Sequence, residues 1–201
     1  MRESGILMHI TSLPAPYGIG TMGKNAYAFV DFLVKAGQRC WQILPLTPTG
    51  YGDSPYQSLG ACAGNHYLID LDTLVDEGLL KKEEIQDISW GNNPKRVDFG
   101  AMYAHRMNVL RLAFQRFAPD EDYETFVEQN RSWLEDYALF TALKDTLGGK
   151  PWLDWPEALR LRKADALAEK RRELSDEIRL QYFVQYEFDR QWKALRSYAN
   201  A

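Results

Sequence analysis

The sequence has few of the residues that build metal centres or disulfide frameworks. Its 201 residues include only two cysteines, Cys40 and Cys62, and three histidines, His9, His66 and His105. The cysteines are too few for a disulfide framework and too far apart for a metal knuckle, and no histidine has a His or Cys partner at the spacing of a zinc site. We therefore expect two buried, inert thiols and no metal.

Long hydrophobic runs and an excess of one charge are also missing. No segment approaches the ~18 apolar residues of a membrane span, and no secretory signal follows the opening Met1-Arg2-Glu3. Against 28 Asp and Glu stand 24 Lys and Arg, a net charge of −4, so no surface that tracks phosphates is indicated. These absences predict a cytoplasmic protein with neither a membrane nor a nucleic acid as its partner.

Aromatic residues, by contrast, are abundant. Six Trp, eleven Tyr and nine Phe make up 13% of the chain, more than a core of this size needs. Such rings often serve as flat apolar platforms for ligands. A role in the core alone is the alternative interpretation.

The first part of the chain has the pattern of two parallel strands joined by a helix. Apolar runs at residues 5–10 and 40–46 predict buried strands. Between them, apolar positions recur at helical spacing over residues 24–36, and Gly37 follows where a C-terminal glycine cap belongs. A strand, a helix and a strand of this length form a right-handed unit with parallel strands, which is an α/β arrangement.

The remainder of the chain is predicted to be mainly helical. Three helical regions are expected at 102–118, 122–147 and 156–199, and the charged stretch 163–172 is interpreted as a solvated helix face. Residues 68–71 are a candidate short strand, and Asp72 a candidate helix N-cap. Two parallel strands do not complete a sheet, so we expect the chain to be part of a larger α/β protein.

A glycine pattern invites a dinucleotide interpretation that its context does not support. Residues 18–23 read Gly-Ile-Gly-Thr-Met-Gly between the first strand and the helix. Seven residues including Pro14 and Pro16 separate that strand from Gly18, and no acidic residue ends the second strand, where a ribose would be bound. A plain glycine-rich loop is the favoured interpretation, and a nicotinamide-dependent oxidoreductase the alternative.

The loop after the second strand is the best site candidate. Residues 47–58 are dense in turn residues and follow the carboxyl end of a strand, the edge at which α/β folds place ligands. Ring faces beside short polar groups can hold a sugar by stacking on it and bonding its hydroxyls. The rings and polar groups are those of Tyr51, Asp53, Ser54, Tyr56 and Gln57. On composition alone, a rigid turn is equally compatible.

Read in full, these segments resemble the amylomaltases, also called disproportionating enzymes, which are 4-α-glucanotransferases of maltodextrin, glycogen and starch metabolism. The resemblance covers essentially the whole chain, with one departure at His66, where the family usually has proline. The segments that carry it are Thr11-Ser12-Leu13-Pro14, Trp41-Gln42-Ile43-Leu44-Pro45-Leu46, Tyr51-Gly52-Asp53-Ser54-Pro55-Tyr56-Gln57-Ser58, Ala63-Gly64-Asn65-His66-Tyr67-Leu68-Ile69-Asp70, Val97-Asp98-Phe99-Gly100, Trp133-Leu134-Glu135-Asp136-Tyr137-Ala138-Leu139-Phe140 and Trp152-Leu153-Asp154-Trp155-Pro156.

The resemblance implies the N-terminal part of a (β/α)8 TIM barrel with its active site at the carboxyl ends of the strands. Residues 1–74 would hold the first two strands, the first helix and the substrate loop. Residues 75–201 would form a large, mostly helical insertion leading to the third strand.

The resemblance also implies an activity and its site residues. The family transfers α-1,4-glucan segments by a retaining mechanism without a cofactor, and its two catalytic aspartates and its acid/base glutamate lie on later strands, so we assign no catalytic residue here. The carry-over places Tyr56 at the donor subsite, with Ser54 and Asp53 shaping its loop, and Tyr51 and Tyr103 at a second glucan-binding groove. The alternative function is a catalytically inactive glucan-binding module.

Overall fold

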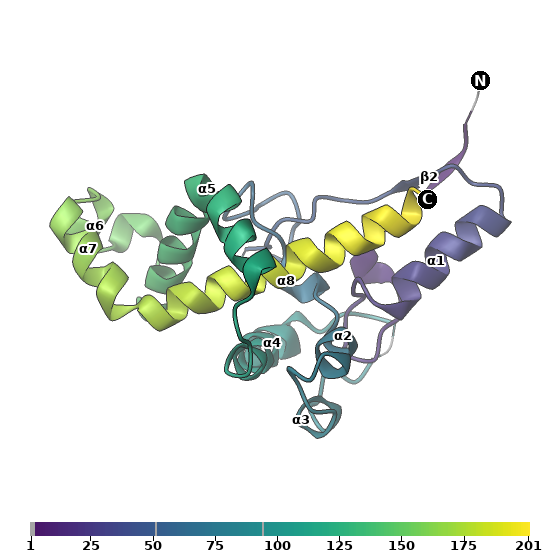
Figure 1. Cartoon of the computed structure of the whole chain (residues 1–201), viewed down its shortest axis with the longest axis horizontal. Coiled ribbons are helices and arrows are strands. Elements are labelled where there is room, and N and C mark those ends of the chain that lie inside the picture. The colour runs from purple at the N-terminus through teal and green to yellow at the C-terminus, as the bar shows by residue number, and fades with distance from the viewer. Residues whose placement is uncertain (1–2, 51, 94) are drawn as a thin grey trace. The chain divides into compact units, whose positions relative to one another are not determined.

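The computed structural model describes residues 3–50, 52–93 and 95–201 (Figure 1). The chain divides into two compact units, one formed by Met1–Ala118 with Glu187–Ala201 and the other by Pro119–Tyr186. None of the helices in the described part is long and apolar enough to cross a membrane.

The first unit begins with the predicted strand, helix and strand. β1 (Gly5–Leu7) and β2 (Cys40–Gln42) pair in parallel, with Gly5 opposite Cys40, and α1 (Lys24–Lys35) lies between them in sequence. The glycine cap is confirmed, because Gly37 has a φ of +67°, the left-handed conformation that glycine adopts without strain. Its amide donates to the carbonyl of Val34, and the amide of Gln38 donates to that of Leu33, which closes the helix end.

The strands are shorter and more exposed than the sequence predicts. β1 stops at Leu7, whose side chain is 56% exposed, and a 3-10 helix (Ile10–Ser12) follows where strand was expected. Side chains continue the pairing of the two segments: the Trp41 indole donates to the carbonyl of Met8 at 2.7 Å, and the Leu44 amide donates to Nδ1 of His9 at 3.2 Å. The middle residue of each strand is half-buried and its neighbours are exposed, because α1 covers one face of this two-stranded sheet through the contact of Phe29 with Trp41.

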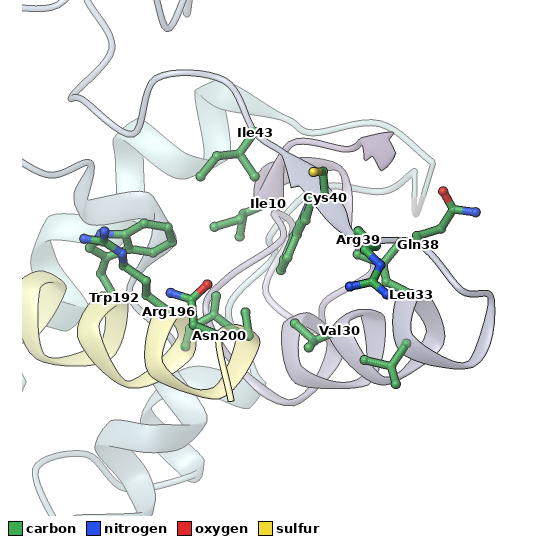
Figure 2. A pocket seen from close by; sticks show the side chains of 14 residues that line it. Ile10, Val30, Leu33, Gln38, Arg39, Cys40, Ile43, Trp192, Arg196 and Asn200 are labelled. Carbon is green, nitrogen blue, oxygen red and sulfur yellow. The ribbon is translucent and has the colours of Figure 1, made fainter. Parts of the chain in front are cut away.

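The prediction of buried thiols is wrong. Cys40 and Cys62 are both free and exposed, because Cys40 lies on the thinly covered strand β2 and Cys62 in an open loop. Beside β2 lies a cavity of about 300 Å³ whose walls come from α1, β2 and the end of α8 (Ser175–Ala199) (Figure 2). Cys40 lines this cavity together with residues such as Val30 and Trp192. None of the predicted site residues lies there.

The rest of the first unit contains α2 (Leu71–Asp76), α3 (Glu83–Gln86), α4 (Phe99–Phe114) and the last part of α8. Two predictions in this region are wrong. The candidate strand at 68–71 is instead the end of a 3-10 helix (His66–Leu68) and the start of α2. The N-cap of α2 is Asp70, whose carboxylate accepts from the Thr73 amide, while Asp72 accepts a hydrogen bond from Lys82 at 2.6 Å.

Asp70 also explains the glycine pattern. Gly23 is the N-cap of α1, and a Cβ built there would lie 2.1 Å from the Asp70 carboxylate, which also accepts from the Thr21 hydroxyl at 2.6 Å. In a dinucleotide site the phosphates occupy the N-terminus of this helix. Here the protein's own carboxylate fills that place, which supports the plain-loop interpretation.

The second unit is helical. It contains α5 (Glu121–Thr146), a 3-10 helix (Trp152–Asp154), α6 (Glu157–Arg160), α7 (Ala164–Glu173) and the first part of α8. The helical region expected over 156–199 consists of three helices, and the first break follows α6, where Arg162 has a φ of +53°. α7 has no buried residue, which confirms the solvated charged face. The core consists of Ala138, Leu139, Ala142, Leu143, Trp155, Leu159, Leu174 and Ile178.

The contact between Gly23 and Asp70 predicts that Gly23→Ala destabilises the protein by about 2 kcal/mol, because the added methyl group forces the carboxylate off its partners. Gly100→Ala is the matched control: its methyl group would lie 3.2 Å from the nearest atom of Asp98, within helix α4, where alanine is favoured over glycine. Urea unfolding curves measure both. Equal stability of the two variants would contradict the prediction.

Candidate functional site

The loop after β2 is closed by its own hydrogen bonds. Thr49 and Ser58 form an antiparallel bridge, and the amide of Asp53 donates to the carbonyl of Gly50 at 3.1 Å. Gly52 and Asp53 both have positive φ, +92° and +57°, which gives the loop a tight turn at its tip. For an aspartate this conformation carries strain, and such strain concentrates at functional sites. Tyr51, a predicted site residue, lies outside the described residues.

Ser54 and Tyr56 form the second half of the loop. The Ser54 hydroxyl accepts from the amide of Tyr56 at 3.3 Å, and its carbonyl accepts from the amide of Gln57 at 3.1 Å. These bonds fix the backbone but leave the Tyr56 side chain 72% exposed. Most of the Tyr56 residue is therefore accessible to a ligand.

Tyr103 reaches this loop from α4. Its hydroxyl donates to Oδ1 of Asp53 at 2.6 Å and lies 3.2 Å from the carbonyl oxygen of Gly50. Burial and the Asp53 carboxylate raise the pKa of Tyr103 to about 12, so the phenol stays protonated at neutral pH. The side chain is 55% exposed. The structure thus joins two predicted site residues, and Asp53 holds a tyrosine ring in place at the surface.

Behind Tyr103 lies a support that the sequence interpretation missed. The ring of Tyr67 meets the ring of Tyr103 edge-on, with centroids 6.1 Å apart, and packs against His66 at 4.2 Å. The amide of Tyr67 donates to the side chain of Asn65 at 3.0 Å. Burial raises the pKa of the Tyr67 phenol and lowers that of His66 to about 3, with the nearby Arg106 charge as a second cause for His66.

Arg106, three residues after Tyr103 on α4, is the second missed residue. Its side chain is completely buried, and its Nη2 donates to the carbonyls of Tyr67, at 3.1 Å, and Ile69. Burial lowers its pKa to about 10, which still leaves it charged at neutral pH. One helix therefore holds both the loop, through Tyr103, and the segment behind it, through Arg106. The signal available in the sequence was an arginine three positions after the site residue Tyr103, on the same predicted helix.

The candidate site presents groups that can bind a ligand, and its described residues form no metal centre. In the part of the chain that the structure describes, no three His, Cys, Asp or Glu residues are grouped so that they could hold a metal ion. What the loop presents is an exposed ring at Tyr56, a fixed ring at Tyr103 and the polar groups of Asp53 and Ser54. Such a surface suits a neutral ligand with apolar faces and many hydroxyls.

Comparison with known proteins identifies the class and then the family. A family model described as 4-alpha-glucanotransferase matches residues 8–201. The chain is 48% identical over 206 residues to a 4-alpha-glucanotransferase of Thermus thermophilus, and 47% identical over 195 residues to that of Clostridium butyricum. The alignments cover 100% and 96% of this chain. The chain belongs to the 4-alpha-glucanotransferase family.

Solved structures agree with this assignment. The structure of the Streptococcus agalactiae amylomaltase in complex with acarbose matches all of this chain with a TM-score of 0.95 and 46% identity. The Corynebacterium glutamicum amylomaltase, at 16% identity and a TM-score of 0.73, shares the fold. The chain spans about 40% of the length of the relatives it matches and 41% of the S. agalactiae chain. The expected resemblance to the N-terminal portion of an amylomaltase is confirmed.

The hydrogen bond between Tyr103 and Asp53 predicts that Tyr103→Phe loosens the loop while keeping the ring. We expect the amides of Asp53 and Gln57 to exchange with solvent several-fold faster, because an intramolecular hydrogen bond contributes about 1 kcal/mol. Hydrogen exchange followed by NMR measures this. Tyr56→Phe is the control, since the Tyr56 side chain is 72% exposed, and unchanged exchange in Tyr103→Phe would contradict the role of the bond.

The low pKa of His66 predicts that acid destabilises the protein. The folded state lowers the pKa of this imidazole to about 3, whereas the unfolded chain takes up a proton near the ordinary pKa of 6.5, so stability is lost as the pH falls below 6.5. The loss approaches about 1.4 kcal/mol per pH unit. His66→Pro should remove this loss of stability at low pH without disturbing the fold, because His66 begins a 3-10 helix, where proline fits.

Urea unfolding of the wild type, His66→Pro and His66→Gln at pH 7.5 and 5.5 measures this dependence. Both variants should lose about 1 kcal/mol less than the wild type on acidification. If all three proteins lose the same free energy of unfolding, His66 does not carry the acid sensitivity.

Proposed function

We propose that this chain is the N-terminal part of a 4-α-glucanotransferase that transfers a segment of an α-1,4-glucan to the 4-position of an acceptor sugar. The observation that carries the proposal is the match to this family over residues 8–201, with a TM-score of 0.95 to a solved amylomaltase. The acarbose bound to that amylomaltase supports a saccharide as the ligand. The exposed ring of Tyr56, beside Ser54 and Asp53, is the surface that would meet it.

In this proposal the loop supplies binding and orientation. Tyr56 lies at the donor subsite, where its open ring stacks on the apolar face of a glucosyl unit. Ser54 and Asp53 shape the loop through the hydrogen bonds described above. Tyr103, held by Asp53, forms a second glucan-binding groove together with Tyr51, away from the reaction centre.

The reaction would be a retaining double displacement. A carboxylate attacks the anomeric carbon and forms a covalent glycosyl ester, while an acid protonates the departing glycosidic oxygen. The same acid, now a base, takes the proton of the acceptor hydroxyl as that oxygen displaces the carboxylate. We place these carboxyl groups on later strands of the family's barrel, and this chain's residues would hold the glucan that the carboxylates cleave.

The fold fits a barrel that begins in this chain. We propose that residues 1–74 open a (β/α)8 barrel, with β1, α1 and β2 as its first unit and the tyrosine loop at the carboxyl end of β2. Residues 75–201 would be a mainly helical insertion before the third strand. The helices α4 to α8 support this proposal.

A chimeric enzyme tests the function. Residues 1–201 of this chain would replace the matching segment of the Thermus thermophilus relative, to which they are 48% identical. We expect the chimera to convert maltoheptaose into a ladder of shorter and longer maltooligosaccharides, measured by chromatography. A folded chimera without products, combined with no maltoheptaose binding by the 201-residue chain, would overturn the proposal.

The same chimera tests Tyr56. Tyr56→Ala should lower kcat/KM for transfer at least about tenfold, because it removes the stacking surface, worth at least about 1.4 kcal/mol. Tyr56→Phe keeps the ring and should retain most of the activity. Tyr51→Ala, at the second groove, should have a smaller effect than Tyr56→Ala. Equal and small effects of Tyr51→Ala and Tyr56→Ala would remove Tyr56 from the donor subsite.

A further inference from the structure

The helical unit contains a cavity that the tyrosine loop does not explain. Its volume is about 310 Å³, at the lower end of the about 300–1,000 Å³ of small-molecule pockets. α5 and α7 contribute walls, and so does the segment between them. The residues that line it are Asp136, Leu139, Phe140, Leu143, Trp152, Trp155, Leu159, Arg162 and Leu167, all within the second unit.

Three of these residues make the cavity aromatic. The ring of Phe140 stacks on that of Trp155, with centroids 5.4 Å apart and planes 27° apart. The Trp155 indole donates to the carbonyl of Lys150 at 3.1 Å, which fixes that ring. Trp152 remains 47% exposed although it lines the cavity. The cavity therefore has a rigid aromatic floor and one large ring accessible from solvent.

Two side chains of opposite charge supply polar groups. Nη2 of Arg162 lies 2.8 Å from Oδ2 of Asp136, and both side chains are about half exposed. An exposed ion pair contributes little to stability. The pair leaves further N–H donors on the guanidinium and lone pairs on the carboxylate. Nη2 of Arg171 lies 3.3 Å from Oδ1 of the same carboxylate, so two guanidinium groups flank Asp136. A hydroxyl of a ligand can accept from a guanidinium N–H or donate to a remaining lone pair of the carboxylate.

The backbone conformation of Arg162 is unfavourable for a residue with a side chain. Its φ of +53° lies in the left-handed region, where a side chain costs about 1–2 kcal/mol and glycine costs little. In the described part of the chain, the one other residue with a side chain and a positive φ is Asp53, in the tyrosine loop. The left-handed residue ends α6, because the amide of Arg162 donates to the carbonyl of Leu159 and the amide of Lys163 donates to that of Ala158. Glycine is the usual residue at such a helix end, and here the position instead carries an arginine side chain that lines the cavity.

We propose that this cavity binds a glucosyl unit of an α-1,4-glucan, as an attachment site separate in sequence from the tyrosine loop. Trp152 presents its ring to the apolar face of the sugar, and Asp136 and Arg162 bond its hydroxyls. The choice of glucan rests on the proposed function. The chemistry of the pocket, aromatic rings beside guanidinium donors and a carboxylate, suits a ligand with an apolar face and several hydroxyls.

Titration of the 201-residue chain with maltoheptaose, followed through the tryptophan indole N–H signals in NMR, tests the site. We expect the Trp152 signal, assigned by its loss in Trp152→Ala, to shift with maltoheptaose and not with cellohexaose. Because Trp152→Ala lacks this indole, the dissociation constant of that variant is measured at the Trp155 indole signal. The affinity for maltoheptaose read from the Trp155 signal should fall at least fivefold in Trp152→Ala. It should be unchanged in Leu153→Ala, a neighbouring residue that is 67% exposed and does not line the cavity.

Arg162→Gly separates binding from stability. Glycine relieves the strain at φ +53°, so the variant should unfold at the same or a higher temperature, yet its affinity at the Trp152 signal should fall at least threefold. Arg160→Gly, which alters a neighbouring arginine outside the cavity lining, should keep the affinity. A variant Arg162→Gly with unchanged affinity would overturn the proposal.

The outcomes for the two sites are distinct. If maltoheptaose shifts signals of the tyrosine loop and leaves both indole signals unmoved, the cavity is not a glucan site and the proposed function stands. If the indole signals respond equally to cellohexaose, the cavity has no preference for an α-glucan and the proposal fails. If no signal moves, the proposal fails as well, and the activity of the chimera alone decides the proposed function.

Discussion

The first unit depends on one buried carboxylate, that of Asp70. It accepts from the amide of Thr73 and so begins α2, it accepts from the hydroxyl of Thr21, and it lies against Gly23 at the start of α1. A negative charge at the N-termini of two helices is favoured by both helix dipoles. The backbone of the same residue donates to the side chain of Gln191 on α8 at 2.7 Å. Three parts of the chain, residues 21–23, residues 70–73 and α8, therefore meet at this one residue.

The candidate site is built outward from this point. Ile69, the residue before Asp70, and Tyr67 give their carbonyls to the buried guanidinium of Arg106. Arg106 thereby sets the position of α4, and α4 presents Tyr103 to Asp53 in the tyrosine loop. A buried cation without sufficient partners is costly, and Nε and Nη1 of Arg106 have no hydrogen-bond partner among the residues that the structure describes. The two carbonyls and the nearby Asp70 charge offset part of that cost.

The sequence predicted the positions of helices and helix ends well where residues close together in the chain determine them. Gly37 ends α1 as its pattern indicated, and α4 and α5 lie within a few residues of their predicted ranges. Asp70 and Asp72 could not be told apart, because either aspartate can cap a helix and the choice depends on Thr21 and Gly23, about fifty residues away. The exposed cysteines were missed for the same reason: burial is decided by what covers a strand, which its own residues do not encode.

In the candidate site too, the loop could be predicted from its own residues, whereas its contacts with residues from other segments could not. The loop itself was found from its residues, because tyrosine, glycine and short polar groups are gathered within it. Its partners Tyr67 and Arg106 were not, since each lies in a segment whose pattern is that of an ordinary helix or turn. In the described part of the chain two residues with side chains have a left-handed backbone, and of these Asp53 was among the predicted site residues whereas Arg162 was not. Asp53 holds Tyr103 in place, and Arg162 lines an aromatic cavity with Asp136. In the first case a carboxylate on a left-handed backbone holds an exposed ring, and in the second a guanidinium on a left-handed backbone lines the same cavity as the exposed ring of Trp152. Both places combine an apolar ring with hydrogen-bonding groups.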